Sequence, residues 1–176
     1  MSSQELSHVI RGLGQPIGVP REAGFSPQRW SLSVAGVVKG ARESVLAVRR
    51  NDNGAWEPPG GIVETGETIE EALIREVEEE TGYQVVPVRL TGVYQNLSAF
   101  VIALVFQCSL VGGSPRPSTE TDEVSWLSLQ DAASLMSDAF ATRVLDAWRF
   151  DIPPVRWHDG HRIIGSVDQQ GRLTPP

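Results

Sequence analysis

Hydrophobic and polar positions alternate in two segments in the first third of the chain. Trp30–Lys39 and Ser44–Arg50 show this alternation and are rich in β-branched residues, which predicts two strands joined by a turn at Gly40. Asn51–Gly61 is predicted to be a loop, because it contains an Asn-Gly pair and a Pro-Pro-Gly-Gly run. The adjacent strand pair favours a mixed sheet over a wholly parallel one.

The period changes to that of a helix over Thr68–Thr81, and Gly82 follows where a left-handed C-cap is favoured. Ser128 and Asp131 resemble a capping box at the start of another helix. Further apolar patterns predict three strands and two helices: Val85–Tyr94, a central strand Ala99–Leu110 and Val124–Leu127, then the helices Leu129–Met136 and Asp138–Arg149. Strands interleaved with helices indicate an α/β fold with a mixed β-sheet.

This pattern divides the chain into three parts. Residues 1–28 are rich in Gly and Pro and are expected to form an irregular N-terminal extension. Residues 29–150 contain the predicted sheet and helices and are expected to form one domain. Residues 151–176 form a C-terminal tail, in which an Asp-Gly pair predicts a hairpin with His158 and His161 on its surface. The tail is expected either to cover a pocket or to form a contact in a homodimer.

The composition limits the class of protein. With 176 residues, 40% hydrophobic and 21% charged, the chain suits one globular domain. It lacks an apolar run of the roughly 20 residues that span a bilayer, and its first residues do not resemble a secretory signal, so we expect no membrane anchor. The lone Cys108 is expected to be a buried thiol and fits the reducing cytoplasm. A net charge of −7 argues against broad nucleic-acid binding.

Almost all of the negative charge lies in one segment. Residues 67–80 contain seven Glu and one Arg, a net charge of −6, so the rest of the chain is near neutral. At about 100° per residue, three of these glutamates share the helix face that carries the apolar residues, and three others point away and are expected to be solvated. The inward group is Glu76, Glu79 and Glu80, and the outward group is Glu70, Glu71 and Glu78.

Three carboxylates that converge on the inward face of a helix repel one another and lose solvation. Their pKa values rise unless a cation compensates the charge. All-oxygen ligands suit the hard ions Mg²⁺ and Mn²⁺. The residues therefore predict a Mg²⁺ site, with Mn²⁺ as an alternative, at Glu76, Glu79 and Glu80.

Residues 61–83, GIVETGETIEEALIREVEEETGY, also carry a motif with fixed offsets. Its specified positions are Gly61, Glu67, Arg75, Glu76, Val77, Glu79, Glu80, Gly82 and Tyr83. At every one of them the chain resembles the signature of Nudix hydrolases. The resemblance implies an α/β/α sandwich over roughly residues 30–150. It also implies hydrolysis of a diphosphate bond in a nucleoside diphosphate that is linked to another group, X.

The resemblance implies roles for individual residues of the motif. The metal ligands would be Glu76, Glu79, Glu80 and the backbone carbonyl of Gly60, with one of the glutamates activating water. Arg75 and Glu67 would complete the catalytic group by orienting the helix residues, Arg75 through a charge-assisted contact to a carboxylate.

Outside the motif, the sequence offers weaker candidates. Family members often add one more acidic ligand from a later loop, for which the candidates here are Glu120, Asp122 and Glu123. Glu120 and Glu123 are equal candidates, and for each a solvated loop acid is the alternative. Arg49 and Arg50 end the strand before the active-site loop, and adjacent strand residues face opposite ways. For each of them, contact with substrate phosphate and a solvent-facing position are equal alternatives. Trp56 is a candidate surface for stacking a base, with core packing as the alternative.

The identity of the substrate is not marked in the sequence. Residues that mark the ADP-ribose, dinucleoside-polyphosphate, NADH and coenzyme A hydrolases of the family are absent, so the chain resembles the compact, MutT-like branch that acts on nucleoside triphosphates. ADP-ribose or a nucleotide sugar is the alternative substrate. A nucleotide-sensing module without turnover is the alternative of another class, although no metal-binding position is substituted.

Overall fold

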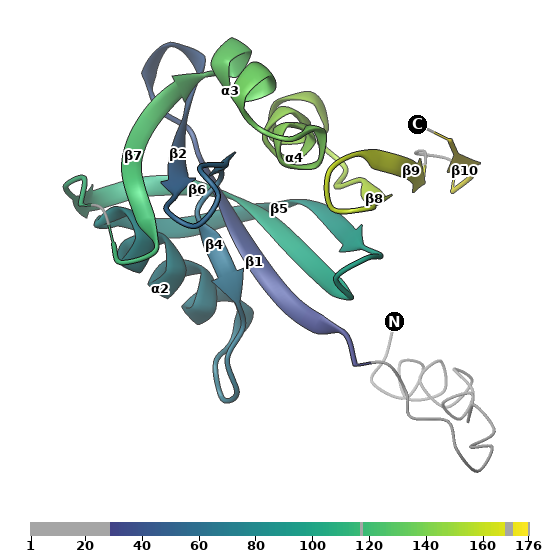
Figure 1. The fold of residues 1–176 in the computed structure, drawn as a ribbon, viewed down its shortest axis with the longest axis horizontal. Coiled ribbons are helices and arrows are strands. Elements are labelled where there is room, and N and C mark those ends of the chain that lie inside the picture. The colour runs from purple at the N-terminus through teal and green to yellow at the C-terminus, as the bar shows by residue number, and fades with distance from the viewer. Residues whose placement is uncertain (1–28, 117, 168–170, 176) are drawn as a thin grey trace, which may run out of the picture.

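Two β-sheets form the centre of the molecule, and helices lie on both sides of them (Figure 1). The computed structural model describes residues 29–116, 118–167 and 171–175. The extension expected over residues 1–28 lies outside these described residues. Within the described ranges, no helix is long and apolar enough to cross a membrane.

The described strands are divided between a larger and a smaller sheet. The larger sheet has the order β10-β9-β8-β5-β6-β1-β4 and consists of β1 (Ser31–Val38), β4 (Gly60–Ile62), β5 (Tyr83–Asn96), β6 (Val101–Gly113), β8 (Val155–His158), β9 (Ile163–Val167) and β10 (Leu173–Thr174). The smaller sheet has the order β3-β2-β7 and consists of β2 (Ser44–Arg50), β3 (Trp56–Glu57) and β7 (Thr121–Ser128). β1 is parallel to β6 and β5 is parallel to β8, while β1–β4, β5–β6 and β8–β9 are antiparallel, so the sheet is mixed as predicted.

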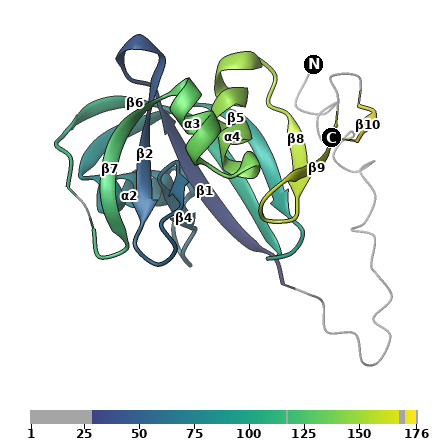
Figure 2. The ribbon, with the colours of Figure 1, turned by 45° about the horizontal axis from the view of Figure 1, so that its top comes forward.

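The helices pack on opposite faces of these strands, because the strands are apolar on both faces. In Figure 2, α3 (Leu129–Leu135) and α4 (Asp138–Arg149) lie in front of the strands and α2 (Ile69–Thr81) lies behind them. On β1, Val34 and Val38 belong to the core cluster that contains α2, and Ala35 and Val37 belong to the cluster that contains α3 and α4. The result is the α/β/α sandwich expected from the sequence.

Local sequence defines both ends of α2. The Thr68 hydroxyl accepts a hydrogen bond from the Glu71 N–H (3.2 Å), and the Glu71 carboxylate accepts one from the Thr68 N–H (2.8 Å). This capping box satisfies backbone donors that the first turn leaves without partners. At the other end, Gly82 takes a φ of 74°, a left-handed conformation that favours glycine. Since both ends are defined, so are the faces on which the glutamates of α2 lie.

Most of the predicted elements are confirmed. The strand Ser44–Arg50 and the helix Asp138–Arg149 have the predicted bounds. β6 lies between β5 and β1, so the strand predicted to be central is flanked on both sides. β8 and β9 form the predicted hairpin, and β8 adds to the sheet beside β5.

Some expectations were wrong. β1 and β2 lie in different sheets, so they are not the pair that makes the larger sheet mixed. The predicted loop over residues 51–61 contains β3 and the start of β4, which are too short to show an alternation. Ser128 caps α3 by accepting from the Asp131 N–H (3.0 Å), but the Asp131 carboxylate contacts the Ser128 hydroxyl (2.7 Å) instead of its backbone N–H. Asp is one methylene shorter than the Glu of a full capping box.

Candidate active site

A cleft of about 910 Å³ lies beside α2, lined by β4 and by residues that precede β7. Its acidic residues are Glu64, Glu76, Glu79, Glu80 and Glu120, and its basic residues are Arg50, Arg75 and Arg116. Five carboxylates therefore face three guanidinium groups, so the cleft carries excess negative charge. The cleft brings the glutamates of the predicted metal site together with Gly60 and Gly61.

α2 presents its three inward glutamates at different depths. Glu80 is buried (7% exposed), the side chain of Glu76 is 16% exposed, and that of Glu79 is 61% exposed. Glu76 and Glu80 thus continue the buried stripe of Ala72, Leu73 and Val77, as the helical period predicts. Glu79 is more exposed than expected, because it lies at the edge of the shared arc, on the rim of the cleft.

The glutamates predicted to point away from the core do so in part. Glu70 and Glu71 are exposed. Glu78 is half-buried, and its carboxylate accepts a hydrogen bond from the Gln84 side chain (3.1 Å).

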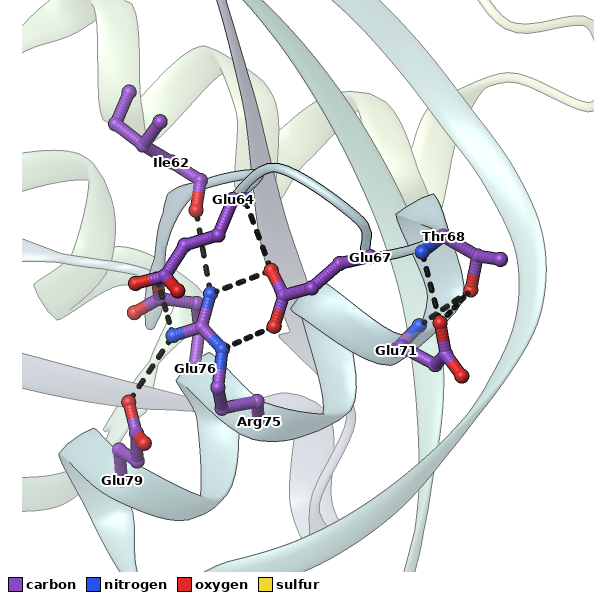
Figure 3. Close-up of polar contacts among 8 residues, drawn as sticks. All are labelled: Ile62, Glu64, Glu67, Thr68, Glu71, Arg75, Glu76 and Glu79. Carbon is purple, nitrogen blue, oxygen red and sulfur yellow. Dashed lines mark hydrogen bonds and ion pairs between the residues drawn. The ribbon is translucent and has the colours of Figure 1, made fainter.

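Arg75 connects the loop after β4 to the carboxylates of α2 (Figure 3). Its Nε and Nη2 donate to the two carboxylate oxygens of Glu67 (2.6 and 3.0 Å). Its Nη1 donates to Glu76 (2.9 Å) and Glu79 (3.1 Å), and its Nη2 also lies 3.3 Å from the Ile62 carbonyl oxygen. The charge-assisted contact from Arg75 lowers the pKa of Glu67 to about 2. Glu67 therefore stays ionised and holds the guanidinium that positions Glu76 and Glu79.

The paired glycines of β4 bring backbone close to these carboxylates. The Gly60 N–H donates to Oε2 of Glu80 (2.8 Å). A Cβ at Gly61 would lie 2.6 Å from Oε2 of Glu76, and a Cβ at Gly60 would lie 2.7 Å from Cα of Ala35 in β1. The backbone of β1 leaves no space for a side chain at Gly60, and a side chain at Gly61 would displace the Glu76 carboxylate.

Two of the carboxylates are difficult to ionise in this environment. Burial raises the pKa of Glu80 to about 8; the Gly60 N–H opposes this shift, and the negative charges of Glu57 and Glu76 add to it. Burial also raises the pKa of Glu76, against the contact from Arg75. The protein groups around Glu80 therefore do not compensate the negative charge of its carboxylate. A bound cation would compensate it.

Glu57 is a residue of this region that the sequence analysis missed. It is buried, and burial raises its pKa although Nη1 of Arg50 lies 3.3 Å from its carboxylate. Arg50 is held in addition by Asp52 through two contacts of 2.9 and 2.8 Å. The sequence signal for Glu57 is a charged residue placed between Trp56 and Pro58.

The structure separates the paired candidates outside the motif. Arg50 lines the cleft, whereas Arg49 forms an exposed ion pair with Glu123 (3.3 Å). Glu120 lines the cleft, and Glu123 does not. Trp56 is partly buried against the core cluster of α3 and α4, which is the core-packing alternative.

Comparison with known proteins identifies the family to which this chain belongs. A family model described as the NUDIX domain matches residues 29–148. The chain belongs to the Nudix hydrolase family. The match includes the whole motif at residues 61–83 and the strands and helices around it.

Individual relatives of this Nudix hydrolase carry different names. A MutT-like protein of Streptomyces ambofaciens is 48% identical over 145 residues, which are 82% of this chain and 94% of that protein. An ADP-ribose pyrophosphatase of Methanocaldococcus jannaschii is 32% identical over 114 residues, 61% of this chain and 68% of that protein. The crystal structure of a MutT protein from Methanosarcina mazei matches with a TM-score of 0.62 at 30% identity and covers 70% of this chain and 97% of that one. Nudix enzymes act on small nucleotide substrates, and the relatives differ in which one.

Nudix hydrolases generally use divalent metal ions, and the residues of the cleft fit one. The donors are carboxylate and carbonyl oxygens, which suit a hard cation, and the buried Glu80 carboxylate has a raised pKa. As the side chains stand, no three acidic, His or Cys residues in the described part of the chain are arranged to hold an ion. Arg75 contacts both Glu76 and Glu79, so a bound ion would share their carboxylates with its guanidinium.

Proposed function

We propose that this protein hydrolyses a diphosphate bond in a nucleoside diphosphate linked to a group X, in a Mg²⁺-dependent reaction, with a nucleoside triphosphate as the leading substrate. The observation that carries the proposal is the buried Glu80, whose charge is not compensated, beside Glu76 and the Gly60-Gly61 backbone. Such a group of carboxylates stabilises the fold poorly by itself, because like charges are brought together in a partly desolvated cleft. It is well suited to hold a divalent cation against phosphate oxygens.

The ligands that we propose for Mg²⁺ or Mn²⁺ are Glu76, Glu79, Glu80 and the carbonyl of Gly60. Glu120 is the better additional ligand than Glu123, because Glu120 lines the cleft and Glu123 is paired with Arg49. A bound divalent ion would supply charge neutralisation at the phosphate oxygens and lower the pKa of a bound water.

The residues of the chain position and activate the reactants. Arg75, held by Glu67, orients the carboxylates of Glu76 and Glu79. Arg50 lines the cleft, and we expect the N–H groups that Asp52 and Glu57 do not use to donate to phosphate oxygens. One carboxylate of α2 accepts the proton of the attacking water as the water approaches phosphorus. The pH profiles of single Gln variants would identify which carboxylate this is.

ADP-ribose or a nucleotide sugar is the second candidate substrate. It is supported by the similarity to the Methanocaldococcus jannaschii protein, which is named an ADP-ribose pyrophosphatase. The cleft of about 910 Å³ is within the range of volumes that hold such ligands.

A hydrolysis screen tests the proposal. Nucleoside triphosphates, nucleotide sugars, ADP-ribose and dinucleotides would each be incubated with Mg²⁺ or Mn²⁺, and phosphate-containing products measured. We expect the wild type to hydrolyse at least one of these substrate classes. Glu80→Gln and Glu79→Gln should lose this activity, whereas Glu70→Gln, at an exposed glutamate of the same helix, should keep it. Unchanged hydrolysis by Glu80→Gln and Glu79→Gln at saturating Mg²⁺ would refute the mechanism. Tight nucleotide binding without turnover would indicate a sensing module instead.

Other expectations from the sequence stay predictions. They are a homodimer contact through the tail, a cytoplasmic location and the lack of nucleic-acid binding. Size-exclusion chromatography with light scattering would test the first.

A further inference from the structure

A second pocket adjoins the proposed phosphate cleft. It has a volume of about 320 Å³ and shares Arg50 and the three residues of β4 with the cleft. Its other walls come from β1, from the end of β3, from the adjoining ends of β5 and β6, and from α4, which contributes Phe140 and Arg143. A ligand whose phosphates lie in the cleft can therefore extend along β4 into this pocket.

Arg143 is an unusual residue to find in such a wall. Its side chain is buried (7% exposed), and its Nε has no hydrogen-bond partner. Cζ of the guanidinium lies 4.6 Å from the ring centroid of Phe140 and 5.4 Å from that of Tyr94. The group makes no ion pair with any described residue. Burial lowers the pKa of Arg143 to about 10, so the group is still charged at neutral pH. A buried cation with an unsatisfied N–H is costly unless a further acceptor is supplied.

His158 does not supply the acceptor that Arg143 lacks. Its Nε2 lies 3.2 Å from Nη2 of Arg143, and its Nδ1 accepts a hydrogen bond from the Gly160 N–H (3.1 Å). A neutral imidazole has one donor and one acceptor nitrogen, so if Nδ1 accepts, Nε2 carries the proton and faces the guanidinium. Burial and the charge of Arg143 also lower the pKa of His158 to about 4, which keeps the ring neutral. His158 thus leaves the guanidinium of Arg143 without an acceptor.

The other polar groups of the pocket point to the same kind of ligand. Oδ1 of Asn96 accepts from the backbone N–H groups of Ser98 and Ala99 (both 3.1 Å), which leaves its NH₂ as a donor. The one carboxylate of the pocket, Glu57, lies against Arg50. Arg143 and Asn96 therefore offer donors that call for acceptors on the ligand, and the Ser33 hydroxyl of the same wall can donate as well as accept.

We propose that Arg143, assisted by Asn96, is a specificity-determining residue that selects nucleotides whose purine base carries an oxygen at C6 over those with an amino group there; this rests on the nucleotide pyrophosphohydrolase activity proposed above. A guanidinium donates to O6 and N7 of a 6-oxopurine together, whereas the amino group of a 6-aminopurine is itself a donor and is repelled. Apart from Ser33, the other side chains of the wall are apolar and suit a planar base better than another phosphate: Val34, Ala35, Pro58, Val101 and Phe140.

Inosine triphosphate and adenosine triphosphate provide the direct test, because their bases differ at C6 and at the N1 proton alone. For the wild type we expect kcat/KM to favour inosine triphosphate roughly 10- to 100-fold, the discrimination that one bidentate arginine provides. Arg143→Met should bring the ratio to about 1, mainly through the loss of inosine triphosphate turnover. Arg143→Lys should give an intermediate ratio, because lysine keeps the charge and loses the planar fork. Arg149→Met, an exposed arginine on the same helix, should keep the wild-type ratio.

The outcomes separate this inference from the proposed function. Hydrolysis of both nucleotides without a preference, or an equal loss for both in Arg143→Met, would refute the role of Arg143 and leave the hydrolase intact. If the wild type hydrolysed neither, calorimetric binding of inosine diphosphate against adenosine diphosphate would still decide whether the pocket discriminates. If thermal melting showed that Arg143→Met is unfolded, the Arg143→Lys ratio would serve, and an unchanged ratio there would overturn the proposal.

Discussion

Replacing Gly61 by alanine should remove activity while leaving the fold intact. The added Cβ would lie 2.6 Å from Oε2 of Glu76, whereas ordinary contact begins at 3.4 Å. The carboxylate must therefore retreat by the difference, about 0.8 Å, or more. Displacements near 1 Å in a catalytic group cost roughly a hundredfold in rate, which corresponds to about 2.7 kcal/mol of transition-state stabilisation. Because the clash is with the end of a flexible side chain, we expect a loss of less than about 1 kcal/mol in the free energy of unfolding.

The assay is kcat/KM for the substrate found in the screen, measured over a range of Mg²⁺ concentrations together with the melting temperature. Gly112→Ala is the matched control, since its Cβ would meet a side-chain oxygen of Gln84 at 3.0 Å outside the cleft. Gly60→Ala should instead destabilise the fold, because its Cβ would meet the backbone of β1. If Gly61→Ala kept kcat/KM within about threefold of the wild type with the same Mg²⁺ requirement, catalysis would not depend on the position of the Glu76 carboxylate.

Two further predictions concern stability. The pKa of His158 is lowered to about 4, below the value of about 6.5 in an unfolded chain, so its contribution is present above pH 6.5 and lost as the pH falls toward 4. Urea unfolding should show that the wild type loses on the order of 2 kcal/mol more than His158→Gln over this range, and parallel acid slopes would contradict it. Asp146 is buried and accepts from Tyr94 (2.7 Å) and twice from Arg156 (2.6 and 2.9 Å). Asp146→Asn should therefore lower the free energy of unfolding, measured with urea, by about 3–5 kcal/mol, and the control Asp151→Asn should leave it almost unchanged. A loss below about 1 kcal/mol for Asp146→Asn would show that the ion pair with Arg156 does not anchor the tail.

Much of the site was predictable because its signals are local. Thr68 and Gly82 mark the ends of α2, and the helical period places Glu76 and Glu80 on its inward face. The prediction for His158 failed because its position depends on neighbours from elsewhere in the chain. His158 was expected on a surface hairpin but is buried, because β8 pairs with β5 and places it beside Arg143 of α4.

The amino-acid sequence alone indicated the family through the motif at residues 61–83, the α/β class through the order of strands and helices, and the helix that carries the carboxylates, since each of these signals lies within a contiguous stretch of the chain. Tertiary structure decided which of two equivalent neighbours faces the cleft. Arg49 and Glu123 are 74 positions apart and neutralise each other outside it, and this leaves Arg50 and Glu120 inside. It also buried Arg143 in a pocket beside β4, where no described residue forms an ion pair with it. Burial and charge compensation are properties of packed neighbours, and residues far apart in the chain become neighbours only when the strands and helices pack together.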